Sequence, residues 1–306
     1  MINKKHNYKN DEDLIFLNKQ YSYFQSYVNK DVNMVYHYTS LDTLSKIIEN
    51  STLRFSNINY QNDECEFTYF FLLLDEHLQE YESYYDKTFY DYLDKLCSKY
   101  CTSPFYYTGP DIQSDGNRQY YISSFSLTDD NLALWTLYTK EKNFIGCNFG
   151  IQPNGISIYS VNDLLTKGVV IYNRDEQDRL LKELLFVIFD KYKKNNYSIN
   201  FLEKIQIFLN KYALFFKHPA FEQEKEYRFV YKPNENFNIQ NFENKPYIDL
   251  PFNIAIDIKS VKLSPTLRAD TYIKELKRLF NKKHLKTKIF TTSMIPFSNK
   301  YSISNE

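Results

Sequence analysis

The sequence predicts an α+β fold with a mixed or antiparallel central sheet, and two observations favour it. Helical periodicity is concentrated in two long blocks, near residues 64–100 and 175–216. Short strand-like segments are spread along the rest of the chain, whereas a doubly wound parallel sheet alternates strands with helices. No internal repeat or low-complexity linker divides the 306 residues. We therefore expect a single domain over residues 1–306, with its sheet split by helical insertions.

The first elements follow from spacing and capping signals. Apolar residues recur at helical spacing within residues 11–28, at Leu14, Leu17, Tyr21, Phe24 and Val28. Residues 1–33 are therefore expected to form an N-terminal helical region. Strands are expected over residues 34–38 and 52–58, separated by a helix that Ser40 caps. A polar break over residues 59–63 then leads into the helical block near 64–100.

The later elements alternate more quickly. Prolines and glycines predict a loop over residues 102–118, and a strand follows over 120–127. Asp129 or Asp130 is expected to cap a helix that ends near Lys140. The C-terminal region, residues 266–306, is expected to contribute one helix and one strand. The other expected elements are strands at 145–151, 155–159, 224–232, 247–250, 260–263 and 287–291, and a helix at 269–280.

Composition excludes several classes of function. Lys and Arg (38) balance Asp and Glu (38), so the basic excess typical of nucleic-acid binders is missing. The six glycines form no GxGxxG or P-loop motif. The four cysteines are too few for a disulfide scaffold and lack zinc spacing, and we predict no metal. No apolar run approaches the ~20 residues that span a bilayer, and no signal-peptide pattern opens the chain. We expect a cytoplasmic protein without membrane contact.

The strongest candidate site lies in residues 224–231. Strand alternation places Glu224, Glu226 and Arg228 on one face and three aromatic residues on the other. Such a charged face is either a solvent-exposed ladder or the wall of a site. Three further segments attract attention: His37 with Tyr38 and Thr39 at a strand end, Ser124 with Ser126 inside a strand, and Trp135 with Tyr138 on one helix face. The last pair is more typical of core packing.

Six short motifs in order resemble the bacterial family DUF2971, whose activity is uncharacterised. They are Tyr36–Ser40, Leu53–Ser56, Asn62-Asp63 with Glu66-Phe67, Ser124–Ser126, Leu134-Trp135 with Tyr138 and Gly146, and Glu224 with Glu226–Arg228. The resemblance covers roughly residues 34–265. It departs from the family at Ser264, where a glycine usually precedes the proline, and after Asp63, where a proline often follows.

The order of His37, the serine-rich strand and Glu226 also resembles the site layout of ADP-ribosyltransferases. This resemblance implies an ADP-ribosyltransferase-like fold and NAD as substrate, with His37 and Glu226 as catalytic residues facing one cleft. It assigns NAD contacts to Tyr38, Thr39, Ser124, Ser126, Trp135, Tyr138, Glu224 and Arg228. Ser124 and Ser126 would brace the strand that carries Glu226, and Arg228 would bind a phosphate or hold the glutamates in place. A fixed carboxylate would stabilise the oxocarbenium-like transition state of nicotinamide release.

Three functions remain open at this point. The first is an NAD-consuming transferase or glycohydrolase, such as a toxin or antiphage effector, acting on a protein or nucleic-acid acceptor. The second is a non-enzymatic module that senses a ligand or binds a protein through the same face. The third is a metal-dependent nucleic-acid-processing enzyme that uses Asp63, Glu66, Glu224 and Glu226 around Mg²⁺.

Overall fold

The computed structural model describes residues 11–60, 67–101, 120–139, 145–154, 165–233, 239–265, 269–283 and 289–296. Its contacts divide the chain into two compact units. The helical unit comprises Met1–Lys30, Asn57–Tyr120 and Gly168–Phe221, and the sheet unit comprises Asp31–Ser56, Tyr121–Lys167 and Glu222–Glu306. The sequence predicted one domain with helical insertions. The contacts gather those insertions, together with the N-terminal helix, into a unit of their own.

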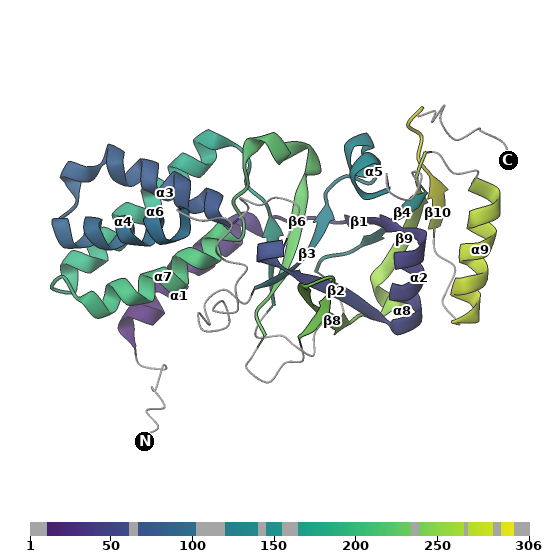
Figure 1. Cartoon of the computed structure of the whole chain (residues 1–306), viewed down its shortest axis with the longest axis horizontal. Coiled ribbons are helices and arrows are strands. Elements are labelled where there is room, and N and C mark those ends of the chain that lie inside the picture. The colour runs from purple at the N-terminus through teal and green to yellow at the C-terminus, as the bar shows by residue number, and fades with distance from the viewer. Residues whose placement is uncertain are drawn as a thin grey trace, which may run out of the picture. The chain divides into compact units, whose positions relative to one another are not determined.

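The helical unit consists of amphipathic helices that pack on one another (Figure 1). Many of their buried residues are aromatic. Its α-helices are α1 (Glu12–Val28), α3 (Thr68–Glu80), α4 (Lys87–Cys101), α6 (Arg174–Lys194) and α7 (Ile199–Ala213). Helix α1 packs on α7, and α3 packs on α4. Phe71 stacks on Tyr100 and Phe24 stacks on Tyr212, each with 4.0 Å between ring centroids. The aromatic abundance therefore serves packing in this unit.

Each predicted helical block contains a break. In the first block, the Asp86 carboxylate accepts hydrogen bonds from Thr88 N and Phe89 N and starts α4. In the second block, Asn196 and Tyr197 adopt left-handed conformations, with φ of 52° and 60°, between α6 and α7. Helical periodicity does not reveal these breaks, because local capping and left-handed turns end a helix without interrupting its apolar pattern.

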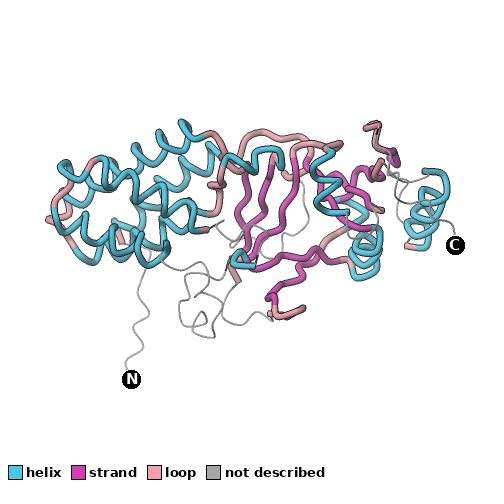
Figure 2. Tube along the Cα trace, turned by 45° about the horizontal axis from the view of Figure 1, so that its top comes forward, coloured by secondary structure: helices cyan, strands magenta, loops and turns pink. Residues whose placement is uncertain are grey.

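Strands that lie almost wholly in the sheet unit, drawn in magenta in Figure 2, pair with one another. The strands are β1 (Val35–Ser40), β2 (Thr52–Asn57), β3 (Tyr121–Ser126), β4 (Gly146–Ile151), β5 (Leu165–Val169), β6 (Glu226–Tyr231), β7 (Gln240–Phe242), β8 (Lys245–Pro251), β9 (Ile258–Leu263) and β10 (Ile289–Thr292). The strand order is β10-β9-β4-β1-β3-β2-β8-β7, with β6 beside β3. The β9–β10 pair is parallel, whereas β1–β3, β1–β4, β3–β6 and β4–β9 are antiparallel. The α+β prediction with a mixed sheet is confirmed.

Short helices accompany this sheet: α2 (Leu41–Asn50), α5 (Leu132–Thr139), α8 (Ile254–Asp257) and α9 (Ala269–Lys282). Helices α2 and α5 both pack on β1 and β4. Ser40 caps α2, as predicted, by accepting a hydrogen bond from Thr43 N. Helix α5 corrects the prediction, because Asn131 Oδ1 is the acceptor at its start, 2.9 Å from Ala133 N. The Asp130 carboxylate binds Trp135 Nε1 instead.

Some predictions fall on other parts of the chain. The expected loop at 102–118 and the expected strand at 155–159 lie outside the described residues. Strands β5 and β7 were not predicted from the sequence. Among the described residues, no helix combines the length and apolar character needed to cross a membrane.

Candidate functional site

A polar sheet face is built by strands β1, β3 and β6. Tyr36 of β1 pairs with Ser126 of β3, and Ser126 pairs with Glu226 of β6. Residues directly opposite each other in a sheet point to the same face, and so do residues two apart on one strand. This face therefore carries Tyr36, Tyr38, Ser124, Ser126, Glu226 and Arg228.

Glu226 is the centre of this face and is held from two directions. Ser124 Oγ donates a hydrogen bond to Glu226 Oε1 over 2.5 Å. Arg228 donates from Nε to Oε1 over 2.7 Å and from Nη2 to Oε2 over 2.9 Å. Glu226 and Arg228 are both buried. The ion pair and the serine fix the carboxylate in one orientation. Of the two roles expected for Arg228, binding a phosphate or holding the glutamates, the contacts with Glu226 match the second.

Ser126 holds the segment that leads into strand β6. Its hydroxyl donates to the carbonyl oxygen of Glu224 over 2.8 Å. Between the two glutamates, Lys225 takes a left-handed conformation with φ of 48°, and its carbonyl accepts from Leu127 N. The chain therefore turns sharply just before Glu226. Both serines contact the segment that bears the glutamates, as the resemblance implied.

A small hollow opens on this face. Its volume is about 20 Å³, which is room for roughly one water molecule. Its two charged lining residues, Glu224 and Glu226, are both acidic. The lining residues are Tyr36, Tyr38, Ser124, Phe125, Ser126, Leu134, Tyr138, Glu224 and Glu226.

His37 does not share this face. Its ring lies against Phe125 and Phe149, with centroids 5.0 and 5.2 Å away. The prediction that His37 and Glu226 face one cleft is therefore wrong, because the β1–β3–β6 register puts them on opposite faces. His37 Nδ1 donates to the Ser124 carbonyl over 2.8 Å, so it contacts the serine strand through the backbone. Burial lowers the pKa of His37, against the effect of this hydrogen bond, and favours a neutral ring.

The remaining predicted residues have separate positions. Thr39 is buried and lies on the same strand face as His37, by alternation. Trp135 is buried with its ring 4.6 Å from that of Tyr38, and it does not line the hollow. Tyr38 donates its hydroxyl to the Thr128 carbonyl and accepts from Asn131 N. Tyr138 lines the hollow and is partly exposed.

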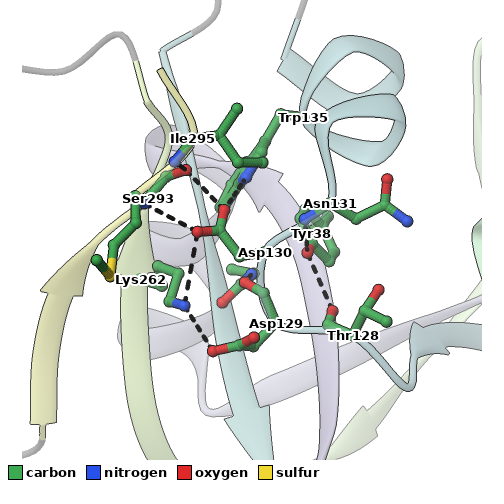
Figure 3. Close-up of polar contacts among 11 residues, drawn as sticks. Tyr38, Thr128, Asp129, Asp130, Asn131, Trp135, Lys262, Ser293 and Ile295 are labelled. Atoms are coloured by element: carbon green, nitrogen blue, oxygen red, sulfur yellow. Dashed lines mark hydrogen bonds and ion pairs between the residues drawn. The ribbon is translucent and has the colours of Figure 1, made fainter. Parts of the chain in front are cut away.

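Sequence reasoning missed a second polar cluster close to Trp135. Asp130 accepts hydrogen bonds from Trp135 Nε1, Ser293 Oγ and Met294 N, and Lys262 pairs with Asp129 (Figure 3). The sequence shows only that Asp129 and Asp130 precede a helix, which is typical of a helix cap. Their partners in β9 and after β10 are more than 130 positions away in the chain, so no local pattern reveals them.

The magnesium hypothesis needs four carboxylates, and the structure describes two of them, Glu224 and Glu226. Asp63 and Glu66 lie outside the described residues. The described residues contain no group of three His, Cys, Asp or Glu side chains placed to hold a metal ion. Glu226 already uses its carboxylate to bind Arg228 and Ser124.

Comparison with known families gives one match. Residues 134–229 match a family described as "Protein of unknown function (DUF2971)". The matched segment begins at Leu134 in α5 and includes Gly146, Glu226 and Arg228, and it confirms the resemblance over that part of the chain. Neither a curated protein nor a solved structure gives a significant match.

Proposed function

We propose that this chain, which matches DUF2971 over residues 134–229, binds a small ligand with a planar cationic ring on the sheet face around Glu226. The ligand to test first is NAD, because its oxidised nicotinamide ring is such a cation and is joined to a hydroxyl-bearing ribose. The proposal is for binding; turnover of NAD is a second candidate.

The composition of the hollow carries this proposal. Both charged residues that line it are glutamates, and the rings of Tyr36, Tyr38 and Tyr138 complete its wall. Carboxylates attract a cation, and aromatic rings add cation–π attraction. Ligand sites usually combine an apolar wall with a few fixed polar groups. Glu226, Ser124 and Ser126 are fixed polar groups of this kind, and their oxygens can also accept hydrogen bonds from ribose hydroxyls.

Two features favour binding over turnover. Arg228 pairs with Glu226 through two hydrogen bonds, so an incoming cation meets the negative end of an ion pair and not a bare charge. His37, the second predicted catalytic residue, lies on the other face of the sheet. Both features weaken the stabilisation available to an oxocarbenium-like transition state.

The Ser124–Glu226 contact is the specific observation that favours the second candidate. A short hydrogen bond of 2.5 Å fixes the carboxylate before any ligand arrives, and preorganised charges contribute much of enzymatic rate enhancement. In this reaction the bond between nicotinamide and ribose C1′ breaks, nicotinamide leaves with the bonding electrons, and water or an acceptor group attacks C1′. Glu226 would stabilise the positive charge on the ribose.

The test compares NAD with NADH by calorimetry. The two differ at the nicotinamide ring, which is cationic in NAD and neutral in NADH. We expect NAD to bind at least ten-fold more tightly. Equal affinities would contradict the cationic-ring argument, and absence of binding would reject NAD as the ligand.

Variants locate the site. Glu224→Gln and Tyr138→Ala should each weaken NAD binding several-fold, since both residues line the hollow. Glu222→Gln is the matched control, because Glu222 is exposed in the same segment and does not line the hollow. If the purified protein releases nicotinamide from NAD, and Glu226→Gln abolishes the release, the second candidate is supported. Binding without release supports the first.

A further inference from the structure

The hollow beside Glu226 is too small for a ligand ring as it stands. Its volume of about 20 Å³ compares with the several hundred Å³ of typical ligand pockets. A ligand therefore requires at least one wall to move. Four of the hollow's five aromatic or aliphatic lining residues come from β1 and α5: Tyr36 and Tyr38 from β1, and Leu134 and Tyr138 from α5. Whatever restrains α5 and these tyrosines also controls the size of the hollow.

A single carboxylate restrains α5 from outside the hollow. Asp130 Oδ1 accepts from Trp135 Nε1 over 2.8 Å and from Ser293 Oγ over 2.6 Å, and Oδ2 accepts from Met294 N over 2.9 Å (Figure 3). These donors come from α5 and from the segment after β10, which are far apart in the chain. Burial raises the pKa of Asp130, but the hydrogen bonds from Ser293 and Trp135 outweigh it, and the pKa lies below its ordinary value.

The segment after β10 is anchored to the sheet on its other side. Ser293 N donates to the Leu263 carbonyl of β9 over 2.8 Å. Lys262, the preceding residue of β9, pairs with Asp129 over 2.5 Å and lies 3.9 Å from Asp130. The positive charge of the Lys262 ammonium group balances part of the negative charge of the Asp129 and Asp130 carboxylates. Asp130 thus connects α5 to a segment that is itself fixed to the sheet.

An apolar contact accompanies this polar one. Ile295 packs on the cluster formed by Tyr38, Leu134 and Trp135, together with Tyr36. Tyr36, Tyr38 and Leu134 also line the hollow. The backbone at Ile295 is held by its N–H, which donates to Ser293 Oγ over 3.2 Å. Ile295 therefore packs against residues that line the hollow, although it does not line the hollow itself.

We propose that Ser293–Ile295, bound by Asp130, is a latch that keeps the hollow closed and so regulates ligand access to Glu226. The inference rests on the proposed binding site and adds its regulation. With the latch in place, α5 and the tyrosines stay packed and only a minor open population binds ligand. Since apparent affinity scales with the fraction of the protein that is competent to bind, release of the latch raises affinity.

The first test measures the latch without any ligand. Ser126→Cys places a thiol at a buried position that lines the hollow. Its rate of modification by a small methanethiosulfonate reagent reports how often the hollow opens, once the labelling of the native cysteines is subtracted. Adding Asp130→Ala should accelerate modification at least ten-fold. Adding Asp129→Asn, which changes the neighbouring carboxylate without touching Trp135 or Ser293, should change the rate less than two-fold.

A second variant tests the latch in case Asp130→Ala does not fold. Ser293→Ala with Ile295→Ala weakens the latch from the segment side and keeps the hydrogen bond between Asp130 and Trp135. Hydrogen exchange of residues 289–296 should accelerate in this variant, and thiol modification should accelerate with it. Faster exchange of the segment with unchanged thiol modification would overturn the latch. An equal acceleration in Asp129→Asn would also overturn it.

The ligand measurement separates this inference from the proposed function. If NAD binds the wild type, the latch variants should bind it at least three-fold more tightly, and equal or weaker binding would overturn the regulatory role. If NAD binds neither form while thiol modification accelerates, the latch stands and the assignment of NAD fails.

Discussion

Arg228 and Glu226, two residues apart on β6, form a buried ion pair in which the guanidinium donates to both carboxylate oxygens, over 2.7 and 2.9 Å. Removing one member of such a pair leaves a charge without compensation in the interior. Arg228→Met should therefore lower the free energy of unfolding by about 3–5 kcal/mol. Chemical denaturation followed by the fluorescence of Trp135, the one tryptophan of the chain, reports this change in the sheet unit.

A matched control and a double variant sharpen the measurement. Arg54 is also a strand arginine of the sheet unit, but its side chain is 49% exposed in its pair with Asp249. Arg54→Met should cost about 0–1 kcal/mol. Replacing both partners, as Glu226→Leu with Arg228→Met, should recover part of the loss, since no unpaired charge remains. Equal losses in Arg228→Met and Arg54→Met would contradict the buried pair.

His37 should make stability depend on pH below the ordinary histidine pKa of about 6.5. Burial lowers its pKa in the folded state, so the unfolded chain takes up a proton at higher pH than the folded chain. Stability is therefore full above the ordinary histidine pKa of about 6.5 and decreases as pH falls toward the lowered folded pKa. His37→Gln keeps a donor for the Ser124 carbonyl and does not titrate. Its stability should fall less steeply from pH 7 to 5; parallel profiles would rule out a buried neutral His37.

Part of this site could be predicted from the sequence, and part could not. Alternation correctly placed Glu226 with Arg228 on one strand face. Alternation within one strand does not determine which residues of the neighbouring strand point to the same face of the sheet. That depends on the pairing of Tyr36 with Ser126 and of Ser126 with Glu226, and a shift of one residue exchanges the faces.

The fold shows the same limit. The spacing of apolar residues and the capping residues predict the α+β class and most of the helices and strands, because these signals are local. The two units and the true role of Asp130 depend on contacts between distant segments. The position of Asp130 in the sequence is typical of a helix cap. In the structure its carboxylate instead accepts hydrogen bonds from Ser293 and Met294, which belong to the C-terminal region.

Gly146 at the start of β4 should tolerate no side chain. A Cβ atom there would overlap Thr139 Cγ2 of α5 and lie 2.9 Å from the Thr39 carbonyl oxygen, which belongs to the backbone and cannot rotate away. Gly146→Ala should lower the free energy of unfolding by about 1–3 kcal/mol. Gly150→Ala is the matched control on the same strand, where the three nearest atoms belong to the side chains of Ser260, Met34 and Tyr36 and none to the backbone, and it should cost less. Equal costs in thermal denaturation would refute this account.

Gln177 organises the interior of the helical unit and gives the last prediction. It is completely buried. Its amide nitrogen donates to the Ile171 and Lys217 carbonyls over 2.7 and 2.9 Å, and its oxygen accepts from Tyr69 OH over 3.0 Å. Gln177→Leu keeps similar volume but removes all three hydrogen bonds, so it should cost at least about 2 kcal/mol, because a lost buried partner costs about 1–3 kcal/mol.

Tyr69→Phe separates this network from general packing at α6. It removes one of the three hydrogen bonds and keeps the aromatic ring, which lies edge-on to His218, so about 1 kcal/mol should be lost. Chemical denaturation followed by far-ultraviolet circular dichroism measures both variants in the helical unit. Equal stability of Gln177→Leu and the wild type would contradict this account. It would mean that the hydrogen bonds of the Gln177 amide do not stabilise the fold, and that apolar packing alone positions α6 against the segment around Ile171.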